Sequence, residues 1–284
     1  MPRKFDMLIT AIAPAVWGST YLVTTELLPA GYPITLALLR ALPAGLILLL
    51  LCRRLPKGVW IGRIALLGAL NFSIFWVLLF VAAYRLPGGV AATMGATQPL
   101  IVILLARLFM GSNIRIMAVL AGFAGLAGVA LLVLAPITAL DPLGVLAGLG
   151  GALSMAAGTV LSKKWQPYVP LLTFTAWQLT AGGLILLPIA VIIEPALPGL
   201  SMRNMAGLLY LGLIGAALTY AIWFRGVAKL PPNVVSTLGL FSPVTAALLG
   251  WGVLGQVLNT AQGLGMMLVL LGVWLSQKRP GKSL

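Results

Sequence analysis

Two stretches of this chain decide its fold: RLPGGVAATMGATQP, residues 85–99, and KLPPNVVSTLGLFSP, residues 229–243. Aligned without a gap at an offset of 144 residues, segments 85–111 and 229–255 are identical at nine of 27 positions. Pro87 pairs with Pro231, and Pro99 pairs with Pro243. Composition alone gives about two or three matches over this length, so we interpret the two segments as copies of one repeat.

The composition predicts an integral membrane protein. Of the 284 residues, 61% are hydrophobic and only 8% are charged, whereas soluble domains carry about 25% charged residues. The mean hydropathy is +1.10. Apolar runs of about 20 residues are typical of membrane-spanning helices and not of barrel strands, in which apolar and polar residues alternate. The predicted fold class is therefore an all-α integral membrane protein.

Ten spans are expected, each about long enough to cross a hydrocarbon core of ~30 Å. The N-terminus resembles a signal peptide, but its apolar run continues past the usual length, so an uncleaved first span is expected. The expected spans are 7–26, 34–51, 64–84, 88–109, 115–134, 143–162, 171–193, 205–224, 232–252 and 260–277.

The basic residues fall almost entirely on one side of these spans. Only Arg85 and Arg203 fall on the other side, and Arg40 lies within a span. Because basic loops stay in the cytoplasm, both termini are predicted to be cytoplasmic and the number of spans to be even. The chain has 18 lysines and arginines, and the other fifteen, all on the predicted cytoplasmic side, are Arg3, Lys4, Arg53, Arg54, Lys57, Arg63, Arg107, Arg115, Lys163, Lys164, Arg225, Lys229, Lys278, Arg279 and Lys282.

The net charge of +14 does not indicate nucleic-acid binding, because the basic residues form no contiguous face. The single cysteine, Cys52, excludes an intrachain disulfide.

Two copies of five spans each imply an inverted-topology repeat, because five is odd and the second copy must enter the membrane from the opposite side. The predicted units are residues 1–138 and residues 139–284. Inverted repeats around a central cavity are typical of secondary transporters, whose halves rock about one site.

The prolines fall into two classes. Pro87, Pro231 and Pro232 sit in turns, where proline opens a helix without losing a hydrogen bond. Pro99 and Pro243 lie in the middle of their spans, where proline kinks a helix. We interpret Pro99 and Pro243 as hinges beside a cavity, with a static packing kink as the alternative.

Polar and aromatic residues cluster on six spans and form the candidate substrate site. Helical spacing places Trp17 with Tyr21, Asn71 with Phe72 and Phe75, and Tyr220 with Trp223 on shared faces. For each aromatic residue, packing or lipid contact is the alternative. The predicted substrate-binding residues are Trp17, Tyr21, Asn71, Phe72, Phe75, Thr93, Met94, Gln98, Met155, Thr159, Tyr220, Trp223, Thr237 and Phe241.

Charged residues are nearly absent from the spans. Arg40 is the exception. We interpret it either as a functional group or as a structural side chain that reaches the outer face or pairs with Glu26. The chain has no histidine, and no acid lies in mid-membrane. Proton coupling through a buried carboxylate is not expected, and Glu26 and Glu194 are the nearest candidates. No catalytic constellation or metal site can be assembled, so no enzyme and no cofactor are expected.

Glycines line one face of the fifth and tenth spans. Gly122, Gly125 and Gly128 recur every third residue, and Gly265 and Gly272 are seven apart. Small faces let helices pack closely, so we expect these spans to be a scaffold in a monomer, with a dimer face as the alternative.

The sequence resembles the EamA family of the drug/metabolite transporter superfamily over its whole length. The resemblance rests on WGSTY at 17–21, Arg40 in the second span, and the prolines within the fourth and ninth spans. It implies a ten-helix basket around a central cavity, with the fifth and tenth spans behind. Many family members carry an acid after the fourth or ninth span, whereas here Gly111 and Gly255 are followed by Ser112 and Gln256.

Within that family the chain looks most like the bacterial inner-membrane exporters of the YddG type. The resemblance implies export of aromatic and other neutral amino acids, which are small zwitterions that need no net charge in the cavity. The alternatives are an exporter of another small metabolite, such as a nucleoside, vitamin or drug, or a non-transporting membrane scaffold.

Overall fold

The computed structural model describes residues 2–29, 31–85, 94–133, 141–166, 168–255 and 259–277. Within these ranges every regular element is a helix. Seven of the helices described are long and apolar enough to cross a membrane, and three shorter apolar helices accompany them, at Gln98–Met110, Ile116–Leu131 and Thr260–Ser276. The predicted all-helical membrane fold is confirmed at this level.

Three of the predicted spans are made of consecutive helices. The elements in chain order are α1 Pro2–Leu27, α2 Pro33–Cys52, α3 Val59–Gly68, η1 Ala69–Ser73, α4 Ile74–Arg85, α6 Gln98–Met110, α7 Ile116–Val133, α8 Pro142–Lys164, α9 Leu171–Ile193, α10 Met202–Leu209, η2 Tyr210–Leu218, α11 Thr219–Lys229, α12 Pro232–Leu238, α13 Phe241–Leu254 and α14 Thr260–Gln277. The segments η1 and η2 are π-helical.

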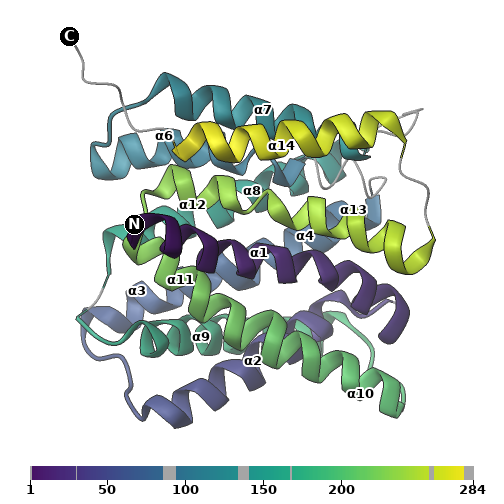
Figure 1. Ribbon diagram of the computed structural model, residues 1–284. Helices are drawn as coiled ribbons and strands as arrows, with labels where there is room; N and C mark the ends of the chain where they lie inside the picture. Colours follow the sequence, from purple (N-terminus) through teal and green to yellow (C-terminus); the bar gives the residue numbers. More distant parts are fainter. Residues whose placement is uncertain are drawn as a thin grey trace.

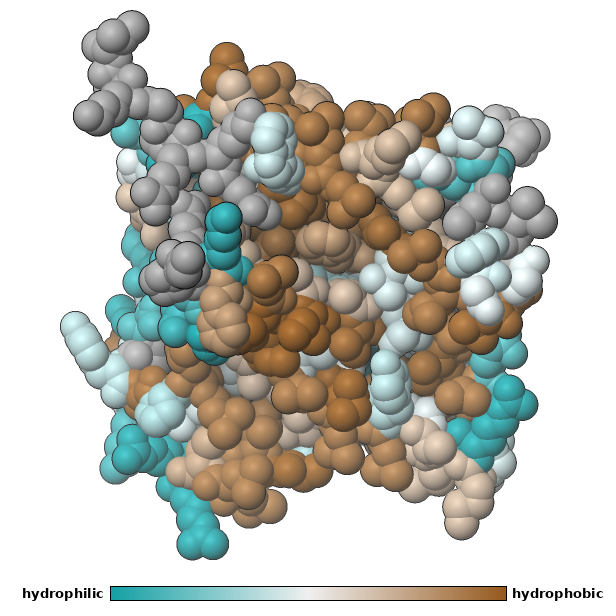
Figure 2. Space-filling view, viewed as in Figure 1, coloured by the Kyte–Doolittle hydropathy of each residue, from teal (hydrophilic) through white to brown (hydrophobic). Residues whose placement is uncertain are grey.

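The helices form one bundle whose axes run in roughly the same direction (Figure 1). Figure 1 shows α7 and α14 side by side at one edge, and α2 and α9 toward the opposite edge, and both pairs are in close contact. Between them, α1 packs on α11 and α13, and α8 packs on α4 and α6. Hydrophobic residues cover the middle of the molecule, whereas hydrophilic residues gather at the two sides where the helices end (Figure 2). This pattern fits a bilayer crossed along the helix axes.

The two prolines expected to kink their spans are placed differently in the structure. Helix α6 begins at Gln98 and α13 begins at Phe241, so Pro99 and Pro243 lie in the first turn of a new helix. A turn at residues 96–97 precedes α6, and a turn at residues 239–240 separates α12 from α13. The first backbone N–H groups of a helix need no partner within it, so proline at these positions costs no hydrogen bond within the helix. Each proline thus follows an interruption of the helix within its span, and both the kink and the hinge role stay predictions.

The turn prolines that the structure describes lie as expected. Pro231 occupies the N-cap position of α12 and Pro232 is its first residue. This placement confirms that the Pro231–Pro232 pair opens a helix, whereas Pro87 lies outside the described residues.

Glycines bring two helix pairs into backbone contact. A Cβ atom at Gly128 of α7 would lie 2.7 Å from the carbonyl oxygen of Gly265 in α14, and one at Gly272 would lie 2.8 Å from that of Ala121. The same holds for α2 and α9, where a Cβ at Gly45 would lie 2.5 Å from the backbone nitrogen of Thr180. Side chains at these positions would force the helices apart. The glycine face of α7 is thus used for packing inside the molecule.

Candidate functional site

An aromatic cluster occupies the contact region between α1, α4, α11 and η1. It consists of Trp17, Phe72, Trp76, Tyr220, Trp223 and Phe224. The ring of Tyr220 lies 4.7 Å from that of Trp17 and 4.7 Å from that of Phe72, measured between centroids. These tilted and edge-to-face arrangements are the ones aromatic rings prefer. The cluster therefore joins predicted site residues from three spans that are far apart in the sequence.

Trp17 is the most exposed member of the aromatic cluster. Its side chain also makes a hydrogen bond to a neighbouring helix. Its indole Nε1 donates to Thr219 Oγ1 at 2.8 Å, and its ring lies 5.1 Å from that of Trp223. Trp17 is half-buried, whereas Phe72, Tyr220 and Trp223 are fully buried. The hydrogen bond fixes the indole against α11, and Trp17 is the member of the aromatic cluster that is only partly buried.

A cation lies directly beside the aromatic cluster. The guanidinium carbon of Arg40 in α2 lies 5.0 Å from the centre of the Trp76 ring, within the range of a cation–π interaction. Its Nη2 donates to the carbonyl oxygen of Gly215 in η2 at 2.7 Å. Arg40 is half-buried in this position. The structure thus places Arg40 against the aromatic cluster and against η2.

Asn71 belongs to a separate polar network between η1, α8 and α9. Its Nδ2 donates to Gln178 Oε1 at 2.8 Å and to Ser162 Oγ at 3.2 Å, and Ser162 Oγ donates to the same Gln178 oxygen at 3.3 Å. All three side chains are buried. A Cβ at Gly158 would lie 2.1 Å from Asn71 Oδ1, so only glycine leaves room for this amide. The network pairs the amide nitrogen of Asn71, which would be costly to bury unpaired, whereas its Oδ1 has no hydrogen-bond partner.

The other predicted site residues fall into distinct groups. Phe75, Met155 and Phe241 belong to the same hydrophobic core as the aromatic cluster. Met94 packs instead with Ala82 and Ala147 in a smaller cluster between α4 and α8. The structure therefore gathers part of the predicted set and leaves Met94 outside it.

Three polar members of the predicted set lie on different helices. Thr237 donates to the carbonyl oxygen of Asn233 at 2.6 Å, within its own helix. Thr159 of α8 is fully buried, and Gln98 is half-buried at the start of α6. Thr93 and the side chain of Tyr21 lie outside the described residues.

Two aromatic members of the cluster were not among the predicted site residues. Trp76 follows Phe72 by four residues, and Phe224 follows Tyr220 by four residues. Residues four apart share one face of a helix, so this spacing was the signal that identifies them. Their ring centres lie 5.4 Å from Phe72 and 6.0 Å from Tyr220, respectively.

Three of the four acids make contacts at the helix ends. Asp6 lies 2.6 Å from Arg225 and 3.6 Å from Lys229. Both carboxylate oxygens of Glu194 accept backbone N–H groups at the start of α2, from Ile34 and Thr35, each at 2.7 Å. A carboxylate at a helix N-terminus stabilises the helix. Glu194, one of the two candidates for proton coupling, thus has a structural contact that accounts for it.

Asp141 caps α8 in the same way. Its Oδ1 accepts the backbone N–H of Gly144 at 3.0 Å, and its Oδ2 lies 3.1 Å from Arg85. The hydrogen bond from Gly144, assisted by Arg85, lowers the pKa of Asp141. Asp141 is therefore an N-cap of α8 whose ionised form is favoured.

Comparison with known proteins identifies the family. Residues 5–134 and residues 142–277 each match the EamA-like transporter family. The protein PecM of Dickeya dadantii strain 3937 is 46% identical over 267 residues, which cover 93% of this chain and 90% of PecM. The uncharacterized inner membrane transporter YedA of Escherichia coli K12 is 29% identical over 279 residues, covering 93% of this chain and 90% of YedA.

The fold also has a counterpart among solved structures. A crystal structure of another protein matches with a TM-score of 0.80 at 20% sequence identity, covering 96% of this chain and 97% of that chain. At this identity the likeness concerns the fold alone. Because the family match covers most of the chain and a close relative matches along nearly all of its length, the chain belongs to the EamA-like transporter family and is a multi-pass membrane transporter.

Proposed function

We propose that this transporter exports neutral amino acids, aromatic ones among them, across the bacterial inner membrane by alternating access. The observation that carries the proposal is the aromatic cluster with Arg40 beside it. Rings offer stacking surfaces to an apolar or aromatic side chain. A guanidinium can hold a carboxylate. One site with both features suits an amino acid of the kind carried by exporters of the YddG type.

The polar groups around the cluster favour a zwitterion over a charged drug. Hydroxyl groups of Thr219 and Ser19 lie on α11 and α1, two helices that form it, and Ser19 Oγ lies 2.7 Å from the phenol oxygen of Tyr210 in η2. None of the four acids of the chain lies in the middle of a span. A cationic substrate would gain no carboxylate partner there, whereas an amino acid would find both apolar and hydrogen-bonding groups.

We further propose ten membrane spans arranged as two inverted repeats, residues 1–138 and residues 139–284. The two stretches that match the family model, 5–134 and 142–277, support this division. The π-helical segments support it too, because η1 shifted by 144 residues falls within η2. Gly111 and Gly255, which end α6 and α13 with φ of 65° and 66°, are also 144 residues apart.

Helix contacts support a two-fold relation between these repeats. A Cβ at Gly45 would meet Thr180, and one at Gly183 would meet Leu42. Residues 42 and 45 correspond to 180 and 183 at an offset of 138, the offset at which AGLILL at 44–49 matches GGLILL at 182–187. The contact between α2 and α9 is thus repeated after exchange of the two helices, as a pseudo-two-fold axis between them requires.

The polar contacts follow the same relation. Arg40 corresponds to Gln178 at the offset of 138, and Asn71 corresponds to Gly215 at the offset of 144. Arg40 donates to the Gly215 carbonyl, and Asn71 donates to Gln178. In each repeat the second span therefore bonds to the π-helical segment of the other repeat. Two π-helical segments and two helix breaks at matched positions suit halves that rearrange around a central site.

The charge distribution supports cytoplasmic termini and a location in the inner membrane, where YedA is described as residing. We expect a monomer that takes a small-molecule substrate and lies in the lipid bilayer. Another small metabolite, such as a nucleoside or vitamin, is the alternative substrate class. Membership of a transporter family disfavours the non-transporting scaffold.

Efflux from liposomes tests the proposed substrate and coupling. Liposomes that contain the purified transporter are loaded with labelled neutral amino acids, or with uridine as the alternative, and efflux is followed with and without a pH gradient. We expect saturable efflux of phenylalanine and tryptophan that is the same in both conditions, because the chain has no mid-membrane acid or histidine. Efflux of uridine alone, or efflux that requires the gradient, would contradict the proposal.

A further inference from the structure

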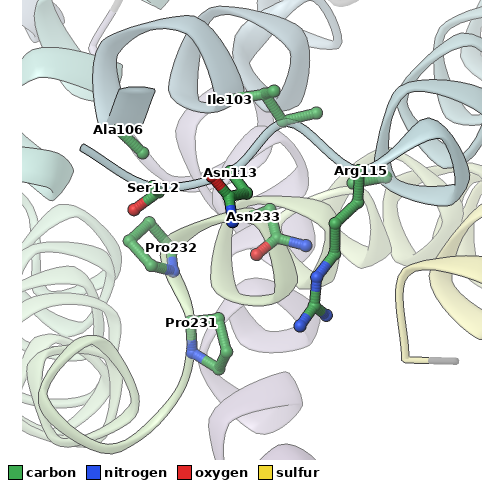
Figure 3. A pocket seen from close by; sticks show the side chains of 9 residues that line it. Ile103, Ala106, Ser112, Asn113, Arg115, Pro231, Pro232 and Asn233 are labelled. Carbon is green, nitrogen blue, oxygen red and sulfur yellow. The ribbon is translucent and has the colours of Figure 1, made fainter. Parts of the chain in front are cut away.

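A cavity of about 510 Å³ lies away from the aromatic cluster, where the end of α6 and the start of α7 meet the start of α12 (Figure 3). On the charge pattern of the chain, this is the cytoplasmic end of the bundle. The cavity joins the fourth and ninth spans, in which a turn precedes α6 and another separates α12 from α13. Its lining residues are Ile103, Ala106, Ser112, Asn113, Arg115, Ala118, Pro231, Pro232 and Asn233.

The polar groups of this cavity suit an anion. Figure 3 shows the amides of Asn113 and Asn233 beside each other, with the guanidinium of Arg115 extending next to Asn233. A guanidinium and two amide NH₂ groups donate hydrogen bonds to carboxylate or phosphate oxygens. None of the residues that line the cavity is acidic, so its charge is positive.

The sequence carries no cation at the three positions that correspond to Arg115, Asn113 and Asn233 in the proposed repeat. At an offset of 144 residues, Arg115 corresponds to Asn259, Asn113 to Val257, and Asn233 to Gly89. The offset holds here, because α7 begins at Ile116 and α14 at Thr260. Arg115 therefore has no cationic counterpart at the corresponding position of the second repeat. Such asymmetry favours capture inside and release outside.

We propose that this cavity is a cytoplasmic capture site that binds the carboxylate of the substrate through Arg115, Asn113 and Asn233 before the substrate reaches the aromatic cluster. The proposal rests on the proposed function, since it takes the substrate to be an amino acid exported from the cytoplasm. A second anion of the same chemistry is the phosphate of an anionic lipid, and the experiment separates the two.

The charge preference of the cavity can be measured without transport. In a Cys52→Ser background, Ser112→Cys places one thiol in the lining, and its reaction rates with an anionic sulfonatoethyl and a cationic trimethylammonioethyl methanethiosulfonate are compared. We expect the anionic reagent to react faster, and Arg115→Gln to shift the ratio of rates by about threefold to fivefold, as removal of one partly screened charge implies. Arg107→Gln is the matched control, because Arg107 lies on α6 at the same end and does not line the cavity.

Protection of the thiol by added ligands identifies what occupies the cavity. L-Phenylalanine is expected to slow modification of the Ser112→Cys thiol in phosphatidylcholine nanodiscs, whereas L-phenylalaninamide, which has no carboxylate, is not. In efflux, Arg115→Gln should raise the internal concentration for half-maximal rate about threefold to fivefold and leave the maximal rate unchanged. An unchanged rate ratio in Arg115→Gln overturns the anion site. Protection by phosphatidylglycerol in the nanodiscs without protection by phenylalanine also overturns the proposal, in favour of a lipid headgroup.

These readouts separate the two proposals. If phenylalanine is not exported but the charge preference depends on Arg115, the proposed substrate fails and the anion site stands. If phenylalanine is exported with wild-type concentration dependence in Arg115→Gln, the capture site fails and the proposed function stands.

Discussion

Alanine at position 128 is expected to destabilise the folded transporter by about 1–3 kcal/mol, the usual range for an overpacked contact. The new Cβ would lie 2.7 Å from the carbonyl oxygen of Gly265 and 2.7 Å from the backbone nitrogen of Val269, so α7 and α14 must separate. Backbone atoms cannot move aside as a flexible side chain can. Thermal unfolding in detergent, followed by loss of the monodisperse peak in size exclusion, measures the effect.

The control lies on the same pair of helices. A Cβ at Gly263 of α14 would meet nothing within 4 Å. Gly263→Ala should therefore be as stable as the original protein or more so, by up to about 1 kcal/mol, because alanine favours the helix. Gly272→Ala should match Gly128→Ala, because the two positions are 144 residues apart and make equivalent contacts. If Gly128→Ala has the same melting temperature as Gly263→Ala, the close packing of α7 on α14 is refuted.

Replacement of Trp17 by alanine is expected to reduce the efflux of phenylalanine at low internal concentration by about tenfold or more. The substitution removes ring contacts to Tyr220 and Trp223 and the hydrogen bond to Thr219. Ring pairs and a hydrogen bond contribute about 1 kcal/mol each, and the substrate also loses an aromatic wall. Initial rates from liposomes give the ratio of maximal rate to half-saturating concentration.

Two further variants distinguish a loss of substrate binding from a loss of folding. Trp251 on α13 is 56% exposed and has no ring partner among the described contacts, so Trp251→Ala should keep efflux within about twofold. Trp17→Phe retains a ring but cannot donate to Thr219, and an intermediate rate is expected. Normal efflux by a Trp17→Ala protein that melts like the original would remove Trp17 from the substrate site.

Hydropathy predicted the all-helical membrane fold, because a bilayer requires long apolar runs with internally satisfied backbones. Helical spacing within one span also predicted which neighbours share a face, as with Tyr220 and Trp223. Partners across spans could not be predicted this way. Gln178 and Ser162, which hold Asn71, lie on two other helices, and no local pattern connects them to Asn71.

The prolines located the helix breaks but did not reveal their form. Pro99 follows a turn at residues 96–97, and α6 begins one residue before it, at Gln98. The π-helical segments had no sequence signal of their own, since they depend on which backbone carbonyl each N–H selects. At Thr219, the N–H bonds to the carbonyls of Ile214 and Ala216. Met94 shows the same limit, because its orientation toward α8 follows from packing and not from spacing.

Exchange across the membrane tests the central claim, a carrier that alternates access to one site. Liposomes are loaded with labelled phenylalanine, and its initial efflux is compared with and without unlabelled phenylalanine outside. If the return of the empty carrier limits the cycle, a carrier that binds external phenylalanine returns to the inside faster. External phenylalanine is therefore expected to accelerate efflux severalfold. Trp17→Ala is expected to remove this acceleration. Efflux that does not saturate and does not respond to external phenylalanine would indicate a passive pore and contradict the account.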